Sequence, residues 1–157
     1  MLSKKERRSQ TGLRGMARLC AVQTSYKAGF CDQKIPDLIN EKDQKIFISE
    51  NLSSSEMDEE FFKNLLSALY ENGCLVDGMV GKHLSAGWKF ERLDSVIKCI
   101  LRLAITELHC FREIPTSVIL NEYIEISKAF FEGSEIAFVN GLLNSAAQEL
   151  RATVPQN

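Results

Sequence analysis

Several features on which metalloproteins and membrane proteins depend are scarce in this sequence. It has two histidines, and no two of its five cysteines stand at a C-x-x-C spacing. Neither a zinc site nor a disulfide framework is therefore expected, and Cys20, Cys99 and Cys110 fall in apolar helical stretches typical of buried, reduced thiols. No stretch approaches the roughly 20 apolar residues of a membrane-spanning helix, and the N-terminus lacks the apolar core of a secretory signal. We expect a cytoplasmic protein without a metal, a cofactor or a membrane partner.

Catalytic motifs are also missing. His109 and Cys110 are neighbours, but adjacent residues of a helix face different directions, which disfavours a Cys/His active site. The glycines match neither G-x-G-x-x-G nor a P-loop. Glu122 and Glu125 stand three residues apart and are better explained as a solvated helix face shared with Lys128. The sequence therefore predicts a protein that acts by binding rather than by catalysis.

What the sequence does contain is helical periodicity, without any alternation of the strand type. The predicted helices span residues 11–29, 36–51, 55–72, 75–84, 94–110, 116–131 and 135–151, and Ser55 is the predicted cap of the third. Residues 94–110 are apolar on nearly all sides, which predicts a central, buried helix. The prediction is an all-α protein, a compact bundle of about six to seven helices. One domain covers residues 13–152, between a basic tail over 1–12, whose flexibility is left open, and a short tail over 153–157.

Charge is distributed unevenly along the chain. Through Lys27 there are seven basic residues and one acidic residue, a net charge of 7 − 1 = +6, whereas the rest has 12 basic and 20 acidic residues, or −8. The basic residues of this segment are Lys4, Lys5, Arg7, Arg8, Arg14, Arg18 and Lys27. Arg14 and Arg18 lie one turn apart on the polar face of the first helix. Such a segment indicates an anion-binding surface, with nucleic acid the first candidate and a solvated tail the alternative.

Phe138 does not fit the apolar face of the last predicted helix. It points roughly 120° away from the centre of the face that Val139 and Leu143 help to form. Such a ring either packs against a neighbouring helix or offers a stacking surface to a base. Phe130, by contrast, is predicted on the inner face of its helix with Ile119.

Four strings then carry a family resemblance. They are ARLCAVQTSY at residues 17–26, ILRLAITEL at 100–108, IPTSVILNE at 114–122 and FVNGLL at 138–143. In this order and at these separations they resemble the NusB family of transcription antitermination factors. The resemblance covers residues 14–151 and implies an all-α fold of two helical halves without catalytic activity. It also implies that the chain pairs with the ribosomal protein NusE and holds single-stranded boxA RNA in nascent ribosomal RNA transcripts. The pair would act with other Nus factors to help RNA polymerase resist termination.

The resemblance also implies site residues. The family's RNA contacts map onto Arg14 and Arg18 of the first helix and onto the aromatic positions Phe130 and Phe138. They extend to the cations of the tail, which are Lys4, Lys5, Arg7 and Arg8. Lysine and arginine neutralise phosphates, and unpaired bases stack on aromatic rings.

A partner position and three departures complete the comparison with the family pattern. Tyr26 matches a position that touches the ribosomal protein. Ile97 replaces a partner-contacting glutamate, so the partner interface is expected to use apolar contact there. Gly15 and Met16 stand where consecutive arginines are common, and Ala137 where a lysine is common. We expect RNA affinity to be lower, or its contacts to shift into the basic tail.

Two other functions stay open at this point. The first is the NusB-like RNA-binding module of ribosomal RNA methyltransferases. It would require a cofactor-binding half, and the sequence contains no Gly-rich strand-loop-helix. The second is a structural helical protein that forms a homodimer through an apolar surface at Ile97.

Overall fold

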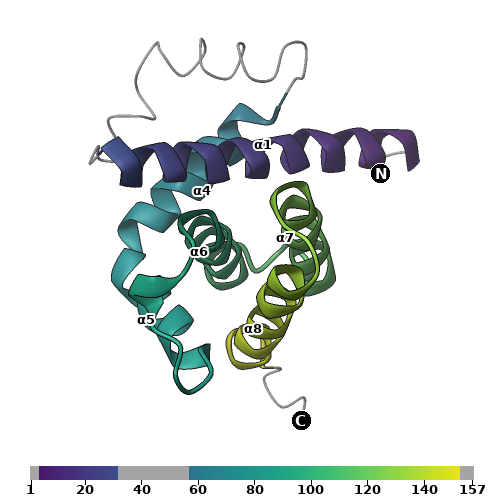
Figure 1. Cartoon of the computed structure of the whole chain (residues 1–157). Coiled ribbons are helices and arrows are strands. Elements are labelled where there is room, and N and C mark those ends of the chain that lie inside the picture. The colour runs from purple at the N-terminus through teal and green to yellow at the C-terminus, as the bar shows by residue number, and fades with distance from the viewer. Residues whose placement is uncertain (1–3, 32–56, 153–157) are drawn as a thin grey trace. The chain divides into compact units, whose positions relative to one another are not determined.

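The structure is a computed structural model that describes residues 4–31 and 57–152 (Figure 1). These residues form six α-helices and one short 3-10 helix, and no strand occurs among them. The elements are α1 Lys4–Cys31, α4 Glu59–Glu71, α5 Gly73–His83, η1 Phe90–Arg92, α6 Ser95–Cys110, α7 Thr116–Phe130 and α8 Ser134–Leu150. The predicted all-α class is confirmed. The predicted helix over 36–51 and the predicted cap Ser55 lie outside the described residues.

Contacts between Cα atoms divide the chain into two compact units, residues 1–70 and 71–157. The two helical halves that the resemblance implied are therefore present. The first unit contains α1 and α4, and the second contains α5, η1, α6, α7 and α8.

Helix α1 begins earlier than the sequence analysis predicted. Its first residue is Lys4 rather than a residue near Thr11, so the backbone of most of the basic segment is helical. Lysine, arginine, glutamate and glutamine all favour helices, and no glycine or proline precedes Gly12 to interrupt them. The charged residues that led to the prediction of a tail over 1–12 therefore form a helix from Lys4 onward.

In the first unit, α4 is joined to α1 at Asp58, the residue before α4 begins. The Asp58 carboxylate caps α4 by accepting a hydrogen bond from the Phe61 backbone N–H at 3.0 Å. The Asp58 backbone N–H donates to the Leu13 carbonyl at 3.1 Å. The buried side of α4 consists of Phe61, Phe62, Leu65, Leu66 and Leu69. Asp58 therefore caps the N-terminus of α4 with its side chain and links α4 to α1 with its backbone.

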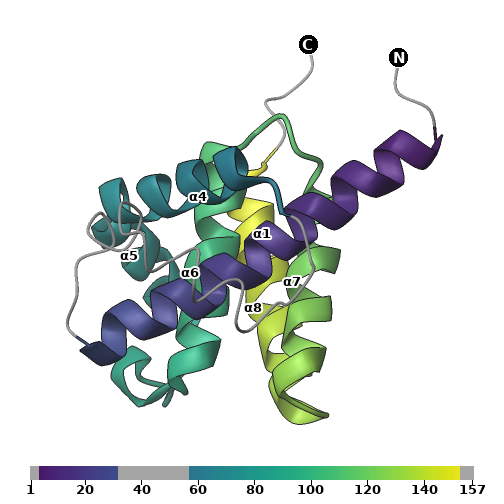
Figure 2. The same ribbon diagram turned by 90° about the horizontal axis from the view of Figure 1, so that it is seen from above.

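In the second unit, α6 is the central element, and α5, α7 and α8 all pack against it (Figures 1 and 2). Ten of its 16 residues are buried, which confirms the predicted central helix. Asp94 caps its N-terminus and accepts hydrogen bonds from the backbone N–H groups of Val96 at 2.8 Å and Ile97 at 3.2 Å. Even Glu107 is fully buried, and its carboxylate accepts a hydrogen bond from the Tyr123 hydroxyl at 2.8 Å.

Arg151, the residue after α8, holds the C-terminal end of α6. Its guanidinium donates to the carbonyl oxygens of Leu108 at 2.7 Å, Phe111 at 3.1 Å and Ile114 at 2.9 Å. The Leu108 carbonyl is one of the last in α6 and has no partner within the helix, so Arg151 satisfies it, and Arg151 also ties the turn after α6, through Phe111 and Ile114, to the end of α8. The pKa of Arg151 is lowered, first by burial and then by Arg112.

Candidate nucleic-acid interface

The cations of the basic segment lie on one helix. Because α1 begins at Lys4, Lys4 stands three and four residues before Arg7 and Arg8, and Lys5 three residues before Arg8. Residues at these spacings are neighbours on a helix surface. Four cationic residues therefore fall within the first two turns of the α1 backbone.

Arg14 is the next cation along α1 and is partly exposed. Its side chain is 42% exposed, and its Nε lies 3.7 Å from an oxygen of the Asp58 carboxylate. The Arg14 guanidinium also lies over the Phe61 ring, 4.8 Å from the ring centroid. An ion pair this exposed is worth at most about 1 kcal/mol, so an incoming phosphate can compete with Asp58 for Arg14.

Arg18 differs from its predicted place on an exposed polar face. It is 1% exposed, and its guanidinium lies 5.1 Å from the centroid of the same Phe61 ring. A stem of three methylene groups and a planar head stacked on a ring explain how an arginine occupies an inner position. Arg18 is therefore a buried residue in this structure, and it cannot reach a phosphate without moving.

The two predicted partner-binding residues, Tyr26 and Ile97, differ in their exposure to solvent. Tyr26 is exposed near the C-terminal end of α1. Ile97, expected at an apolar surface, is only 6% exposed and lies in the first turn of α6. The expectation of an exposed apolar contact at Ile97 is therefore wrong, because α6 is apolar on the side that holds Ile97 and buries it.

Phe130 was predicted on the inner face of α7, and this prediction is wrong. Its side chain is 42% exposed, and its ring centroid lies 6.5 Å from that of Phe131. Ser127 takes an inward position in the last turn of α7 instead; it is fully buried and donates a hydrogen bond to the Tyr123 carbonyl at 2.8 Å. The position that the family resemblance assigned to RNA is thus accessible.

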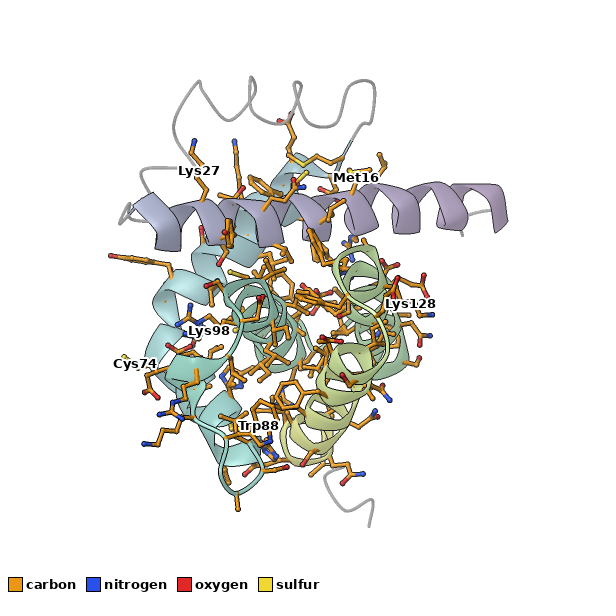
Figure 3. The ribbon with its side chains drawn as sticks, in the orientation of Figure 1. Met16, Lys27, Cys74, Trp88, Lys98 and Lys128 are labelled. Carbon is orange, nitrogen blue, oxygen red and sulfur yellow. The ribbon has the colours of Figure 1, made fainter. Side chains whose placement is uncertain are left out.

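Phe138 packs against another aromatic ring. Its ring centroid lies 5.4 Å from that of Trp88, with an angle of 34° between the planes, and Phe138 itself is half-buried. Figure 3 places Trp88 in the loop after α5. Both readings of the sequence thus apply in part, because the ring contacts a neighbour and is still partly accessible. Trp88 was missed, since a single tryptophan in a loop has no periodicity that would connect it with residue 138.

A polar cluster between α5 and α8 was also missed. His83 Nδ1 lies 2.8 Å from Ser145 Oγ, and His83 Nε2 lies 2.8 Å from a carboxylate oxygen of Glu149. Lys82 contacts the other oxygen of the same carboxylate. Hydrogen bonds from Lys82 and then from His83 hold the pKa of Glu149 below its usual value. No sequence signal joins residues more than 60 positions apart, so only the fold reveals this cluster.

The cysteines follow the predicted pattern with one exception. Cys20 and Cys99 are buried, and burial raises the pKa of Cys20 to about 11. Cys110, predicted to be buried, is exposed and accepts a hydrogen bond from the Asn72 side chain at 3.5 Å. Its pKa is raised, first by desolvation and then by the nearby Glu71 carboxylate. A raised pKa lowers the thiolate fraction on which a Cys/His pair would depend.

Neither a metal site nor a membrane-spanning helix occurs among the described residues. No group of three or more His, Cys, Asp or Glu side chains among them is arranged to hold a metal ion. None of the helices found in residues 4–31 and 57–152 has the length and apolarity needed to cross a bilayer. Of the solvated face predicted on α7, Glu125 and Lys128 are exposed, with Lys128 Nζ 2.9 Å from a Glu125 carboxylate oxygen, whereas Glu122 is half-buried.

These features define an all-helical protein with a cationic helix in one unit and accessible aromatic rings in the other. The chain belongs to the NusB family, whose sequence profile matches residues 16–148. It is 36% identical to the transcription antitermination protein NusB of Caulobacter vibrioides over 140 residues, which cover 88% of this chain and 94% of that protein. It is 33% identical to the protein of the same name from Bartonella quintana, over 88% of this chain and 90% of that protein.

Solved structures agree with the family. A crystal structure of T. maritima NusB superposes with a TM-score of 0.68 at 28% identity, covering 87% of this chain and 91% of that chain. A chain from the crystal structure of antitermination factors NusB and NusE in complex with double-stranded RNA gives a TM-score of 0.72 at 21% identity, covering 86% and 96%. At that identity the second match shows the shared fold.

Proposed function

We propose that this protein is an RNA-binding adaptor in transcription antitermination. With the ribosomal protein NusE, it binds boxA RNA in nascent ribosomal RNA transcripts and helps RNA polymerase to resist termination. Relatives of 30% identity and above are named transcription antitermination proteins, and one solved complex of this fold contains NusE and RNA. The observation that carries the proposal is the run of cations on α1 of a NusB-family chain, since RNA is the polyanion on which such a protein would act.

In this proposal, the two units contribute different forces. Cations of α1, which are Lys4, Lys5, Arg7, Arg8 and Arg14, neutralise RNA phosphates. Phe130 and Phe138 of the second unit stack on unpaired bases. Arg18 was assigned to RNA with Arg14, but its burial against Phe61 gives it a supporting role in keeping α1 on α4.

The protein partner would meet the exposed Tyr26 near the end of α1. The burial of Ile97 removes the apolar surface on which both a rebuilt partner contact and a homodimer were expected to depend. Other Nus factors and RNA polymerase are reached through the complex rather than by a separate site. We assign the protein no catalytic step and place it in the cytoplasm, where RNA is transcribed in cells that use these factors, with residues 13–152 acting as one NusB-like domain.

Fluorescence anisotropy of a labelled boxA-type RNA tests the proposal. The protein is titrated alone and with NusE, each at two salt concentrations, and a scrambled RNA of the same length serves as the control. We expect tighter binding with NusE, and weaker binding at the higher salt concentration, because phosphate contacts release counterions. Equal binding of both RNAs under all four conditions contradicts the proposal.

A further inference from the structure

Trp88 is the most exposed of the large apolar side chains in the described residues. It is the only tryptophan of the chain, and 57% of it is accessible. A tight turn presents it, with the Trp88 backbone N–H donating to the Ser85 carbonyl at 3.1 Å and Gly87 at a φ of 93°. This φ suits glycine, so the turn depends on Gly87 and fixes the backbone from which Trp88 extends.

One face of the Trp88 indole already has a partner. Phe138 lies beneath it at a centroid distance of 5.4 Å, and the two planes are tilted by 34°. A residue that contacts a ring on one side and remains more than half accessible exposes its other side to solvent. Phe138, which the sequence analysis selected for stacking, is the more covered ring of the two.

The surroundings of Trp88 favour an anionic ligand. Residues 82–92 include Lys82, Lys89 and Arg92 against Glu91, a net charge of 3 − 1 = +2. Lys82 is engaged by Glu149, whereas Lys89 and Arg92 are exposed beside the ring in sequence. Two residues after Trp88, the Phe90 ring has a cation over it, with Lys98 Nζ 5.2 Å from its centroid. Alternating rings and cations are the composition of surfaces that bind single-stranded nucleic acid.

We propose that Trp88 is the outer ring of a two-ring platform on which an unpaired RNA base stacks, with Phe138 as the supporting ring beneath it. This inference rests on the proposed function and refines it: Trp88 makes the direct base contact, and Phe138 contributes to stacking by supporting Trp88. The exposed ring with cations on both sides in the sequence favours a nucleotide over an apolar protein surface, because a base offers a π-face together with a phosphate. The base would stack on the accessible part of the indole, since 57% of Trp88 is exposed.

The single tryptophan makes the test direct. Trp88 fluorescence is recorded while boxA-type RNA is added to the full chain, and the anisotropy of the labelled RNA is followed in parallel. We expect RNA to quench the fluorescence with the same midpoint as the anisotropy change and to protect the indole from acrylamide. If anisotropy reports binding while fluorescence and acrylamide access stay constant, the platform is wrong and the proposed function stands. If anisotropy reports no binding with or without NusE, both fail.

Variants complete the test. Trp88→Ala is expected to weaken RNA binding about 10-fold, since a base loses its stacking partner, and Trp88→Phe to recover most of the loss. Tyr70→Ala removes another exposed ring and should leave the affinity unchanged. Helix content by circular dichroism verifies that each variant is folded. Unchanged affinity in Trp88→Ala, or a fluorescence response to NusE but not to RNA, overturns the proposal.

Discussion

The two units differ in how they use arginine and aromatic side chains. In the first unit, the guanidinium groups of Arg14 and Arg18 both lie over the buried Phe61 ring. In the second unit, Arg102 forms a two-pronged ion pair with Asp77 at 2.7 and 3.0 Å, while rings such as Trp88 and Phe130 are exposed. In the proposed function, the cations for phosphates and the rings for bases thus come from separate stretches of the chain. Each contribution can be removed without the other.

The same contrast exists within α1 itself. Arg14 and Arg18 stand one turn apart over one ring, yet Arg14 is partly exposed and Arg18 is buried. Position on the helix, rather than residue type, therefore decides which of the two arginines is accessible.

The largest effect is expected from Arg18→Ala, which should lower the free energy of unfolding by about 3 kcal/mol, because it removes a buried cation–π contact and leaves a cavity. Chemical denaturation measures the change. Arg14→Ala is the matched control and should cost less than about 1 kcal/mol of stability while weakening RNA binding. Equal stability losses in the two variants would contradict the difference between these arginines.

Replacing Lys4, Lys5, Arg7 and Arg8 together by glutamine should weaken RNA binding about 100-fold at 0.1 M salt. The slope of log affinity against log salt should fall by about 3, if each contacts a single-stranded phosphate. Anisotropy titrations at several salt concentrations measure both. Glutamine in place of Lys63 and Arg112, two cations outside α1, is the control. A slope that stays constant in the quadruple variant would show that the start of α1 does not touch RNA.

Arg151→Ala should destabilise the second unit by about 2 kcal/mol. The variant leaves the carbonyl groups at the end of α6 without their charged donor. Thermal unfolding reports the loss, and the affinity of the folded variant for RNA should stay at the wild-type value. A variant that unfolds like wild type but binds RNA poorly would show that Arg151 contributes to RNA binding and not to stability.

The smallest effect concerns pH and Glu149→Gln. The folded state lowers the pKa of Glu149 below its ordinary 4.5, so the carboxylate stabilises the fold above pH 4.5, and this contribution disappears as pH falls through the folded value. Wild type should therefore exceed the variant in melting temperature at pH 7 and match it in strong acid. A difference that is constant across this range would mean that the contacts with Lys82 and His83 do not depend on charge.

The helices could largely be predicted from the sequence, because amphipathic periodicity is a local property. Helix α6 was located within one residue at its beginning, since ten buried positions within 16 residues leave little ambiguity. The beginning of α1 was missed because a highly charged segment can be a helix or a tail with equal ease. The α4 cap belongs to Asp58, which was not predicted as a cap.

The candidate site was harder to predict, because accessibility depends on residues distant in sequence. Arg18 has a polar side chain at a position that Phe61, 43 residues later, covers. Phe130 has an apolar side chain that the end of α7 leaves outside. Trp88 could be identified as part of a candidate site only from its ring contact with Phe138, which the sequence does not predict. Family resemblance selected Phe130 and Phe138 as RNA-contacting positions; Phe130 is exposed and Phe138 is half-buried, and the resemblance could not indicate what lies beside them.

The proposed function depends on rings of the second unit contributing to RNA binding by stacking, a force that depends on salt far less than the phosphate contacts of α1 do. The salt dependence of RNA binding by Phe138→Ala tests it most directly. The account predicts an affinity about 10-fold below wild type at every salt concentration, with the slope unchanged, since a ring contributes stacking but no charge. An affinity equal to that of wild type, in a variant that circular dichroism shows to be folded, would contradict it.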